Sequence, residues 1–484
     1  MTTEGKCRFG VTGLAVMGAN LARNVASRGI PVAIHNRTQA KADDLYAEHG
    51  KDGPMTLTHS VEEFVAAIER PRPILIMVQA GKPVDAVIAG IEPYLDPGDI
   101  LIDGGNSLFT DTQRRTRDLE AKGLRFLGVG VSGGEEGALH GPSIMPGGTP
   151  EAYQRVEEVL TAIAAQANGE PCCAYMGPDG AGHYVKMVHN GIEYALMQLI
   201  AESYDLLHQV LGLSPSELSG VFADWNEGDL QSFLVEITST VLGKTDAATG
   251  QPLVDVIQDE AEQKGTGRWT VQSALDMGVP TPDIAEAVLA RSLSALKDER
   301  VQASKVLQGP DVRFDDQERE RNAGLVDAVR DALYAAELTA YAQGFAQLMA
   351  ASRQYDWNLH PGQIATVWRG GCIIRARFLD RIKEAYDADP ALHNLLLAPY
   401  FRDIVVGAQA SWRRVVGLAV ESGVPAPVYS AALAYYDGYR RARTPANLIQ
   451  GLRDLFGAHT YHRVDRPGSF HVRWSEDGAE EQTS

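Results

Sequence analysis

Residues 9–29 read FGVTGLAVMGANLARNVASRG, and this stretch decides the fold of the first third of the chain. A short apolar run precedes a turn that begins and ends with glycine, and an amphipathic pattern follows the turn. The first glycine permits a tight turn, and the last allows a helix to pack closely on the strand. The pattern predicts a dinucleotide-binding turn with alanine at its middle glycine position, the alternative being an ordinary glycine turn without a ligand. The positions concerned are Gly13, Leu14, Ala15, Val16, Met17 and Gly18.

Strand and helix patterns alternate from the N-terminus to about residue 178. The predicted strands are continuously apolar, which is typical of strands buried on both faces of a parallel sheet. They span residues 7–12, 31–36, 74–78, 99–105, 125–131 and 172–176. Thr149 followed by Pro150 predicts the start of the last helix of this region. The predicted fold class is therefore α/β, with a doubly wound, Rossmann-like dinucleotide-binding domain over residues 1–178.

Strand patterns almost vanish after this region, and long helical patterns predict a large all-α domain over residues 179–440. Two short segments in it resemble each other loosely, which hints at a duplicated helical unit. Each follows a long helix and carries a tryptophan, Trp225 in one and Trp368 in the other. A charged run at 315–324 predicts an exposed loop and the start of a helix.

The last segment, residues 441–484, has a composition of its own. It predicts a helix followed by extended chain, and the acidic end SEDGAEEQTS is expected to be disordered. A tail of this kind often docks on another surface.

Composition excludes several classes of protein. The chain has 484 residues, which predicts at least two domains, and its formal net charge of −19 argues against nucleic acid or anionic membrane as a partner. An anionic ligand must therefore be held by a local cluster of Arg and Lys. The four cysteines show neither a disulfide framework nor zinc-ligand spacing, so we predict no metal site and a reducing, cytoplasmic location. Neither a signal peptide nor a membrane span is expected from the sequence.

The end of the second predicted strand distinguishes between two nicotinamide cofactors. A carboxylate at this place binds the ribose hydroxyls of NAD. This chain has Asn36, Arg37 and Thr38 instead. Because Arg37 can pair with a 2′-phosphate in forked geometry, the sequence predicts NADP.

Two further loops follow predicted strands, at their carboxyl ends. They are Asp103-Gly104-Gly105-Asn106 and Ser132-Gly133-Gly134. Ligands bind at this edge of doubly wound sheets, and Gly-Gly turns present backbone N–H groups to anions. One such loop alone would be read as a simple turn, but two beside a nucleotide turn predict a binding crevice.

Lys186, His189, Asn190 and Glu193 occupy positions i, i+3, i+4 and i+7 of a long helical pattern. This spacing places them on one face, with Lys186 and Glu193 about 10 Å apart along the helix axis. Burial can move the pKa values of Lys and Glu toward neutrality, which suits general acid–base catalysis. The alternative is a solvated ion pair on a surface helix.

With these motifs in place, the chain resembles the decarboxylating 6-phosphogluconate dehydrogenases over essentially its whole length. The segments that carry the resemblance are GLAVMGANLARN, NRT, IDGGN, GVSGGEEGALHGPSIMPGG, GAGHYVKMVHNGIEY, DEAEQKGTGRWT, KDERVQASKVL, GCIIRARFL, LLLAPYF and FGAHTY. The resemblance implies NADP-dependent oxidation and decarboxylation of 6-phosphogluconate to ribulose 5-phosphate in the pentose phosphate pathway. It also implies a homodimer whose C-terminal tail reaches the partner's site.

The resemblance assigns roles to matching positions. Lys186 is the implied general base and then acid, Glu193 the proton donor, and Asn190 the third catalytic residue. The implied substrate contacts are Asn106, Ser132, Gly133, Gly134, His189, Asn190, Tyr194, Lys264, Arg291, Arg453 and His459. Among them, Lys264, Arg291 and Arg453 hold the phosphate, and Arg453 and His459 act from the partner subunit.

One departure from the family pattern concerns the cofactor. Val78, Gln79 and Ala80 match a nucleotide-contacting segment, to which Asn106 also belongs, and the family usually has lysine where this chain has Gln79. The change removes a cation and puts NADP selectivity in doubt, but Arg37 is retained and NADP stays the prediction.

Two other readings remain open at this point. A β-hydroxyacid dehydrogenase of the 3-hydroxyisobutyrate type shares the nucleotide domain and the lysine, but such chains are shorter. A non-catalytic NADP-binding protein would keep the turn and Arg37 without needing Lys186 and Glu193.

Overall fold

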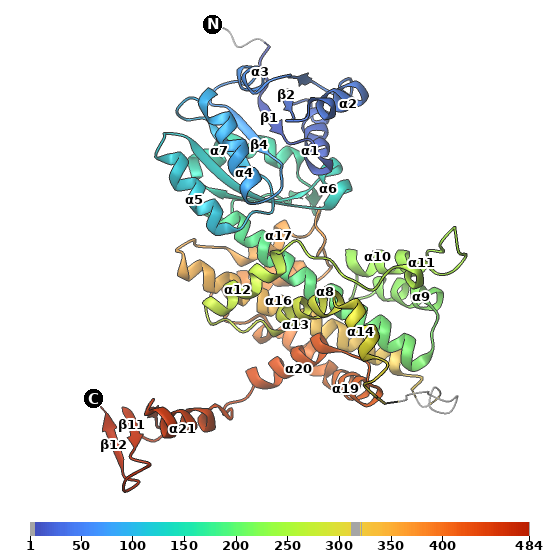
Figure 1. The fold of residues 1–484 in the computed structure, drawn as a ribbon, viewed down its shortest axis with the longest axis vertical. Helices are drawn as coiled ribbons and strands as arrows, with labels where there is room; N and C mark the ends of the chain where they lie inside the picture. The colour runs from blue at the N-terminus through green and yellow to red at the C-terminus, as the bar shows by residue number, and fades with distance from the viewer. Residues whose placement is uncertain (1–4, 311–319, 321, 484) are drawn as a thin grey trace. The chain divides into compact units, whose positions relative to one another are not determined.

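A seven-stranded sheet forms the first third of the chain, in the order β3-β2-β1-β4-β5-β6-β7 (Figure 1). The computed structural model describes residues 5–310, 320 and 322–483, so the loop predicted at 315–324 lies largely outside the described residues. The strands are β1 (Phe9–Thr12), β2 (Val32–His35), β3 (Met55–Leu57), β4 (Pro73–Ile76), β5 (Ile100–Asp103), β6 (Arg125–Ser132) and β7 (Ser143–Gly148). Strands β1 to β6 pair in parallel, which confirms the predicted doubly wound sheet. The order reverses between β1 and β4, where such sheets bind ligands.

Two predictions about strands are wrong. Strand β7 follows the Ser132-Gly133-Gly134 loop, where we predicted no strand, and it pairs antiparallel with β6 at the edge of the sheet. Pro146 and two glycines make this strand hard to recognise in the sequence. At the sheet edge proline is tolerated, and the Pro146 carbonyl oxygen still accepts the Met176 backbone N–H at 2.8 Å. Conversely, residues 172–176 form no strand, although Cys173 makes an isolated bridge with Ile144 of β7.

Helices cover both faces of the sheet. They are α1 (Val16–Ser27), α2 (Gln39–His49), α3 (Val61–Ala66), α4 (Lys82–Ile91), α5 (Phe109–Glu120), α6 (Gly134–His140) and α7 (Pro150–Ile163), with a 3₁₀ turn at Glu92–Tyr94. Side chains alternate along each strand, so neighbours enter different cores. Ile100 and Ile102 pack with α1 and α7, whereas Leu101 packs with α3, α4 and α5.

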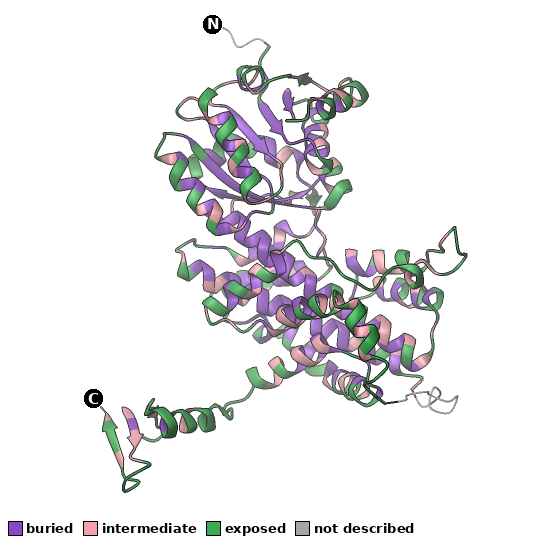
Figure 2. Cartoon of the chain, in the orientation of Figure 1, coloured by how far each residue is buried: buried purple, intermediate pink, exposed green. Residues whose placement is uncertain are grey.

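The helical region is built around two long helices, α8 (Ala181–Leu211) and α16 (Leu325–Gln354), which pack against each other. Figure 2 shows both buried along much of their length. Around them lie α9 (Pro215–Asn226), α10 (Phe233–Leu242), α11 (Leu253–Val256), α12 (Thr266–Asp276), α13 (Pro282–Ser294), α14 (Lys297–Ala303), α17 (Pro361–Val367), α18 (Leu379–Ala388), a 3₁₀ turn at Leu395–Leu397, α19 (Pro399–Ser422) and α20 (Pro427–Tyr439). Trp225 and Trp368 lie at the ends of the short helices that follow the two long ones, and both are buried.

The first turns of α8 lie directly against the sheet. A Cβ atom at Gly130 of β6 would be 2.4 Å from the Cβ of Lys186, and one at Gly147 of β7 would be 2.3 Å from the backbone nitrogen of Gly182. Only glycine fits at such distances, so the strand glycines allow the helix to approach at backbone range. Lys186 is thereby fixed against β6 by main-chain packing.

Residues Leu433–Ser484 form a second compact unit. It contains α21 (Ala446–Gly457) and an antiparallel sheet of β10 (Tyr461–His462), β11 (Ser469–Val472) and β12 (Glu480–Thr483). The fully buried Asp454 carboxylate accepts hydrogen bonds from the Trp474 indole (2.8 Å) and from the backbone N–H groups of Thr460 (3.1 Å) and Val472 (3.1 Å). These bonds join the helix to the sheet.

The acidic end of the chain is more ordered than predicted. It contributes β12, and the Glu480 carboxylate accepts hydrogen bonds from Tyr461 (2.6 Å) and Arg463 (2.9 Å). Composition alone missed these partners because they lie 17 and 19 residues upstream. Separately, none of the described helices is long and apolar enough to span a membrane.

Candidate functional site

The turn between β1 and α1 has the geometry that a dinucleotide requires. Gly13 adopts φ +93°, and a Cβ there would lie 2.4 Å from the Met77 carbonyl oxygen. A Cβ at Gly18 would lie 1.9 Å from the Gly13 carbonyl oxygen, so α1 can begin this close to β1 only with glycine. The Leu14 backbone N–H donates to the Asn36 side-chain oxygen at 2.9 Å, which ties the turn to the loop after β2.

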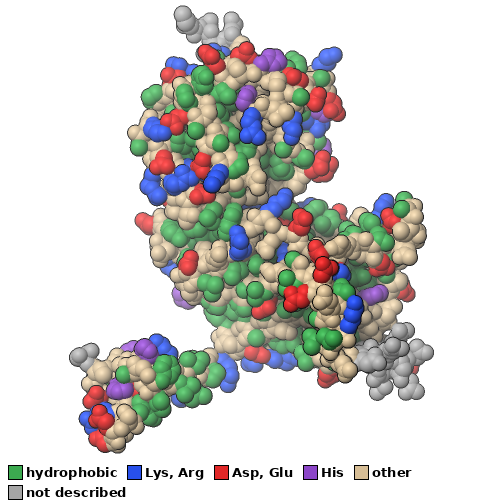
Figure 3. All heavy atoms as spheres, viewed as in Figure 1, with side chains coloured by type: hydrophobic (Ala, Val, Ile, Leu, Met, Phe, Trp, Pro, Cys, Tyr) green, Lys and Arg blue, Asp and Glu red, His purple; other side chains and the backbone are tan. Residues whose placement is uncertain are grey.

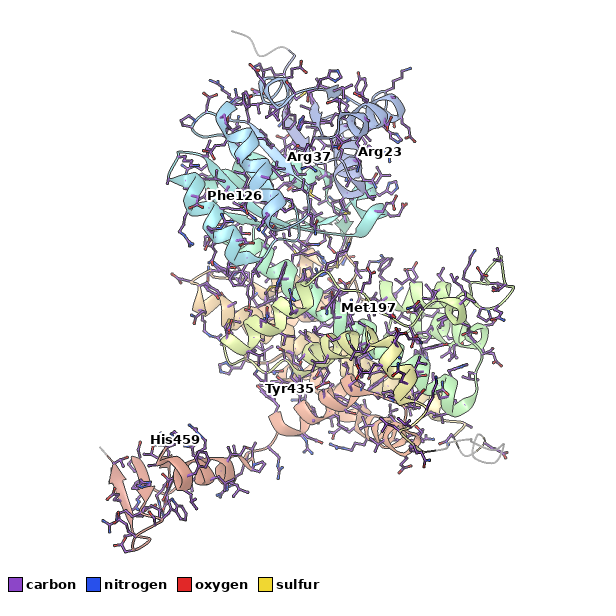
Figure 4. All side chains as sticks on the ribbon, in the orientation of Figure 1. Arg23, Arg37, Phe126, Met197, Tyr435 and His459 are labelled. Atoms are coloured by element: carbon purple, nitrogen blue, oxygen red, sulfur yellow. The ribbon has the colours of Figure 1, made fainter. Side chains whose placement is uncertain are left out.

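The rim of this turn is open to solvent. Ala15, Val16, Arg37 and Thr38 are exposed, and the Asn36 amide donates to the Thr38 carbonyl oxygen at 2.9 Å. Arg37, labelled in Figure 4, lies in the loop between β2 and α2 and is exposed, so its guanidinium is accessible to an anion. Gln79 is exposed in the loop after β4, while Val78 and Ala80 on either side of it are half-buried. Close-packed glycines, a helix N-terminus and an exposed arginine fit a dinucleotide that carries a 2′-phosphate.

The loops after β5 and β6 are held in different ways. Asp103 stabilises its own loop, because its carboxylate accepts hydrogen bonds from the Gly105 backbone N–H (3.0 Å) and from the Ser107 hydroxyl (2.6 Å). Asn106 is left exposed at the tip of that loop. After β6, Gly133 adopts φ +120°, and a Cβ there would lie 2.7 Å from the Gly371 carbonyl oxygen.

The predicted stripe on α8 is confirmed as one face of a single helix. Lys186, His189 and Asn190 are buried, and Glu193 is half-buried one turn further on. The Lys186 Nζ lies 3.2 Å from His189 Nδ1, and the same ring nitrogen lies 3.1 Å from the Asn190 side-chain oxygen. On the other side of the ring, His189 Nε2 lies 3.4 Å from the Ser132 hydroxyl. The structure thus brings α8 and the end of β6 together.

Burial moves the pKa values of these groups in the directions that acid–base chemistry needs. Burial lowers the pKa of Lys186, and the opposing attractions of Glu193 and Cys372 only partly offset it. Burial likewise raises the pKa of Glu193 against the opposing effects of Lys186 and Arg291. The pKa of His189 lies well below its usual range, chiefly because the ring is buried and further because Lys186 is adjacent. Both shifts make the uncharged form of each group easier to reach than it is in water.

A cation borders the far end of this face. The Arg291 guanidinium of α13 stacks on the Tyr194 ring, 3.4 Å from its centroid, and donates to the Glu262 carbonyl oxygen at 3.2 Å. Lys264 is exposed in the loop before α12. Arg453 and His459 belong to the second unit, where both are exposed, and His459 is labelled in Figure 4. Arg453 donates to the Gln450 side-chain oxygen at 3.0 Å.

Sequence reasoning missed two parts of the site. Cys372 contacts His189 with its sulfur 3.1 Å from Nε2, although the two residues are far apart in the sequence. The glycines of β6 that admit α8, Gly128 and Gly130, were read only as part of an apolar strand. Their spacing of two residues, which puts both on one face of the strand, was the available signal. Cys372 lies in GCIIRARFL, one of the segments that carry the resemblance, but nothing in the sequence indicated its contact with His189.

Two family models match this chain. The NAD binding domain of 6-phosphogluconate dehydrogenase matches residues 8–177, and the 6-phosphogluconate dehydrogenase C-terminal domain matches residues 182–474.

Relatives match over nearly their whole length. The NADP(+)-dependent, decarboxylating 6-phosphogluconate dehydrogenase of Bacillus subtilis (strain 168) is 57% identical over 469 residues, which cover 97% of this chain and 99% of the relative. The decarboxylating 6-phosphogluconate dehydrogenase of Escherichia coli (strain K12) is 55% identical over 471 residues, with the same coverage. A solved Plasmodium falciparum 6-phosphogluconate dehydrogenase superimposes with a TM-score of 0.93 at 40% identity and covers 97% of this chain and 100% of its own. That protein was solved in its apo form, with its cofactor NADP+ and with its substrate 6-phosphogluconate.

Proposed function

Because the chain belongs to the 6-phosphogluconate dehydrogenase family, we propose that it oxidises and decarboxylates 6-phosphogluconate with NADP, forming ribulose 5-phosphate and carbon dioxide in the pentose phosphate pathway. The observation that carries the proposal is the buried face of α8. It holds an amine and a carboxyl whose pKa values burial shifts in opposite directions, Lys186 downward and Glu193 upward. A cytoplasmic location is part of the proposal and is supported by the free thiols of all four cysteines.

Lys186 acts first as a base. In its neutral form it accepts the proton of the substrate's C3 hydroxyl as that carbon is oxidised to a ketone. NADP, when bound, accepts the hydride that leaves C3. His189 holds the amine in place because its Nδ1 lies 3.2 Å from the Lys186 Nζ. Asn190 supports His189, since its side-chain oxygen lies 3.1 Å from the same ring nitrogen.

Lys186 and Glu193 then share the decarboxylation. The 3-keto acid loses its carboxylate as carbon dioxide, and the electron pair of the broken bond forms an enediol. The Lys186 ammonium gives its proton to the developing oxygen at C3 and so replaces a charge-stabilising metal. Glu193 protonates the carbon that has lost the carboxylate, and Lys186 recovers a proton from the enediol hydroxyl to leave a ketone. The cycle ends with an ammonium and a carboxylate, so one proton must pass from Lys186 to Glu193 before the next turnover.

The pH dependence of kcat should follow from these two groups. Turnover requires neutral Lys186, which exists above its pKa, and protonated Glu193, which exists below its pKa. The lowered lysine pKa extends activity toward acid, and the raised glutamate pKa extends it toward base. We expect a bell-shaped profile in wild type. Glu193→Gln can neither ionise nor protonate carbon, so its kcat should fall strongly, and the residual activity should lack the basic limb. A basic limb unchanged in that variant would assign it to another group.

Arg37 should determine the preference for NADP. Replacing it with alanine removes the forked partner of the 2′-phosphate, so we expect KM for NADP to rise roughly 30-fold while KM for NAD changes little. The measurement is kcat/KM with each cofactor at saturating substrate. Arg28, which lies at the far end of α1 and donates to the His140 carbonyl oxygen at 3.3 Å, provides a matched control as Arg28→Ala. Equal losses with both cofactors would remove Arg37 from 2′-phosphate recognition.

We also propose a homodimer whose subunits exchange their C-terminal units. Support comes from α21, on which Leu448, Ile449, Leu452, Leu455 and Phe456 are each more than half exposed. Their spacing puts them on one helix face, and Figure 3 shows apolar side chains gathered along this unit. Such a face is stable in water when another surface covers it. Arg453 lies on the same helix, and in this proposal it enters the partner's site together with that helix.

The test of the activity is a spectrophotometric assay of NADPH formation at 340 nm. We expect reduction of NADP with 6-phosphogluconate and with none of gluconate, 3-hydroxyisobutyrate or other unphosphorylated hydroxy acids. Release of one carbon dioxide per NADPH distinguishes oxidative decarboxylation from simple oxidation. Turnover of an unphosphorylated acid alone would favour a dehydrogenase of the 3-hydroxyisobutyrate type, and no turnover with any of them would favour a binding protein.

A further inference from the structure

The segment between α17 and α18 passes behind the catalytic face of α8. It is fixed at Gly371, whose carbonyl oxygen accepts the Ser143 backbone N–H at 2.8 Å. The next residue, Cys372, is buried, and its sulfur lies 3.1 Å from His189 Nε2. The Trp368 ring packs edge-on against the same imidazole, with 5.5 Å between centroids. His189 therefore has Lys186 on one side. On the other side it has the Cys372 thiol and the Ser132 hydroxyl, whose oxygen lies 3.4 Å from Nε2.

Lys186, His189 and Cys372 form a continuous series of polar contacts. The series ends at a backbone carbonyl group. The Cys372 thiol donates to the Trp368 carbonyl oxygen at 3.3 Å, at the C-terminal end of α17. Trp368 is fully buried, and within the described part of the chain this thiol is the one donor on its carbonyl. A buried carbonyl without a donor is costly, so the S–H group is held in this direction.

The direction of the S–H group decides where the imidazole carries its proton. A neutral imidazole has one N–H donor and one acceptor nitrogen. With the thiol hydrogen on the Trp368 carbonyl, the sulfur offers a lone pair to Nε2, which must then carry the proton. Nδ1 is left as an acceptor for Lys186, which can donate one N–H to it and still direct its own lone pair at the substrate.

The contact between Nδ1 and the Asn190 side-chain oxygen would suit the opposite tautomer. The two possibilities differ in what can adjust. A half-turn of the Asn190 amide replaces the oxygen with an NH₂ donor, whereas the Trp368 carbonyl belongs to the backbone and can only accept. The Ser132 hydroxyl near Nε2 can rotate to accept as well as to donate. The fixed backbone acceptor therefore decides the tautomer, and the amide and the hydroxyl adjust to it.

We propose that Cys372 is a positioning residue that holds His189 in its Nε2–H tautomer and thereby keeps the Lys186 lone pair directed at the substrate hydroxyl. The inference rests on the proposed function of Lys186. The other charged groups that face Lys186 are Glu193 on its own helix and, beyond Glu193, Arg291 of α13, and neither touches the imidazole. Burial raises the pKa of the Cys372 thiol to about 12. The thiol therefore stays protonated and can donate its hydrogen to the Trp368 carbonyl.

The test compares two substitutions at this position. Cys372→Ser keeps a group that both donates and accepts, and we expect kcat within about threefold of wild type. Cys372→Ala removes it, and we expect kcat to fall roughly tenfold while the calorimetric Kd for 6-phosphogluconate stays within about twofold. Loss of the acceptor on Nε2 also weakens the acceptor offered to the Lys186 ammonium, so the lysine pKa falls and the acid limb of kcat moves to lower pH. A packing role would affect both variants alike and leave the limb in place.

The matched control is Cys172→Ala. Cys172 is a buried thiol whose sulfur lies 3.9 Å from the Thr366 carbonyl oxygen. We expect unchanged kcat and an unchanged acid limb. Wild-type kinetics in Cys372→Ala, or equal losses in Cys372→Ser and Cys372→Ala, would overturn the inference. If wild type itself does not turn over 6-phosphogluconate, the proposed function fails instead.

An infrared measurement tests the series of polar contacts from Lys186 to the Trp368 carbonyl without an activity assay. The S–H stretching band of Cys372, identified as the band lost in Cys372→Ser, should lie at lower frequency than that of Cys172, since only the former makes a close hydrogen bond to a carbonyl. A band at the frequency of a free thiol would contradict the proposed direction of the S–H group.

Discussion

Replacing Lys186 with methionine is expected to reduce turnover of 6-phosphogluconate roughly 10³-fold or more, because the variant loses the amine proposed to take and return the C3 hydroxyl proton. Methionine keeps the length and apolar stem of lysine, so the packing of α8 against β6 should survive. NADP binding, measured by calorimetry, should change little because the residues of the nucleotide turn are untouched. Both the oxidation and the loss of carbon dioxide should disappear together.

Lys122→Met is the control for the loss of a lysine. Lys122 is exposed and pairs with Glu92 at 2.6 Å. We expect it to match wild type in every measurement. Turnover by Lys186→Met at the wild-type rate would show that Lys186 is not the base, whatever the family to which the chain belongs.

Arg453→Ala should cost roughly 10²-fold in kcat/KM if the guanidinium holds the substrate phosphate, since a charged partner inside a site is expensive to lose. Subunit mixing then tells whether it acts within its own chain or on the partner. At low substrate concentration, neither Arg453→Ala nor Lys186→Met alone should show more than roughly 1% of wild-type activity. A mixed dimer contains one site with an intact lysine and, if the C-terminal units are exchanged, an intact arginine from the other subunit.

Refolding the two variants together in equal amounts should restore roughly a quarter of wild-type activity, because half of the dimers are mixed and each of those has one intact site. If Arg453 serves its own chain, the mixture stays inactive. Arg443→Ala, a change at an exposed arginine before α21, is the control for the loss of a surface cation and should leave homodimers active. The two outcomes are separated by far more than assay error.

Local patterns allowed much of this fold to be predicted. The turn at Gly13 and Gly18 and the stripe from Lys186 to Glu193 depend on spacing within one element, which periodicity reveals directly. Strand β7 was missed because Pro146 and its neighbouring glycines are typical of turns, and only its place at the sheet edge makes them acceptable. Residues 282–307 carry one continuous helical pattern, whereas the structure has α13 and α14 with a break between them.

Contacts between distant segments lay beyond the sequence. Cys372 meets His189 because the segment after α17 returns to the sheet, and no spacing within either segment implies this. Order in the acidic C-terminal end depends in the same way on Tyr461 and Arg463. Composition predicts the structure of a segment in isolation. The segment after α17 and the acidic C-terminal end are both stabilised by contacts with residues elsewhere in the protein.

The strand glycines that contact α8 limit which amino-acid substitutions the protein can tolerate. A methyl group added at Gly130 would push against the Cβ of Lys186, although Gly130 offers no side chain to any ligand. Displacing a reacting group by about 1 Å can cost roughly 10²-fold in rate, so such a change would be nearly as harmful as losing a side chain that performs the chemistry. Intolerance to substitution should therefore extend from the reacting groups to glycines inside strand β6. These positions would be missed if only residues that contact a ligand were considered.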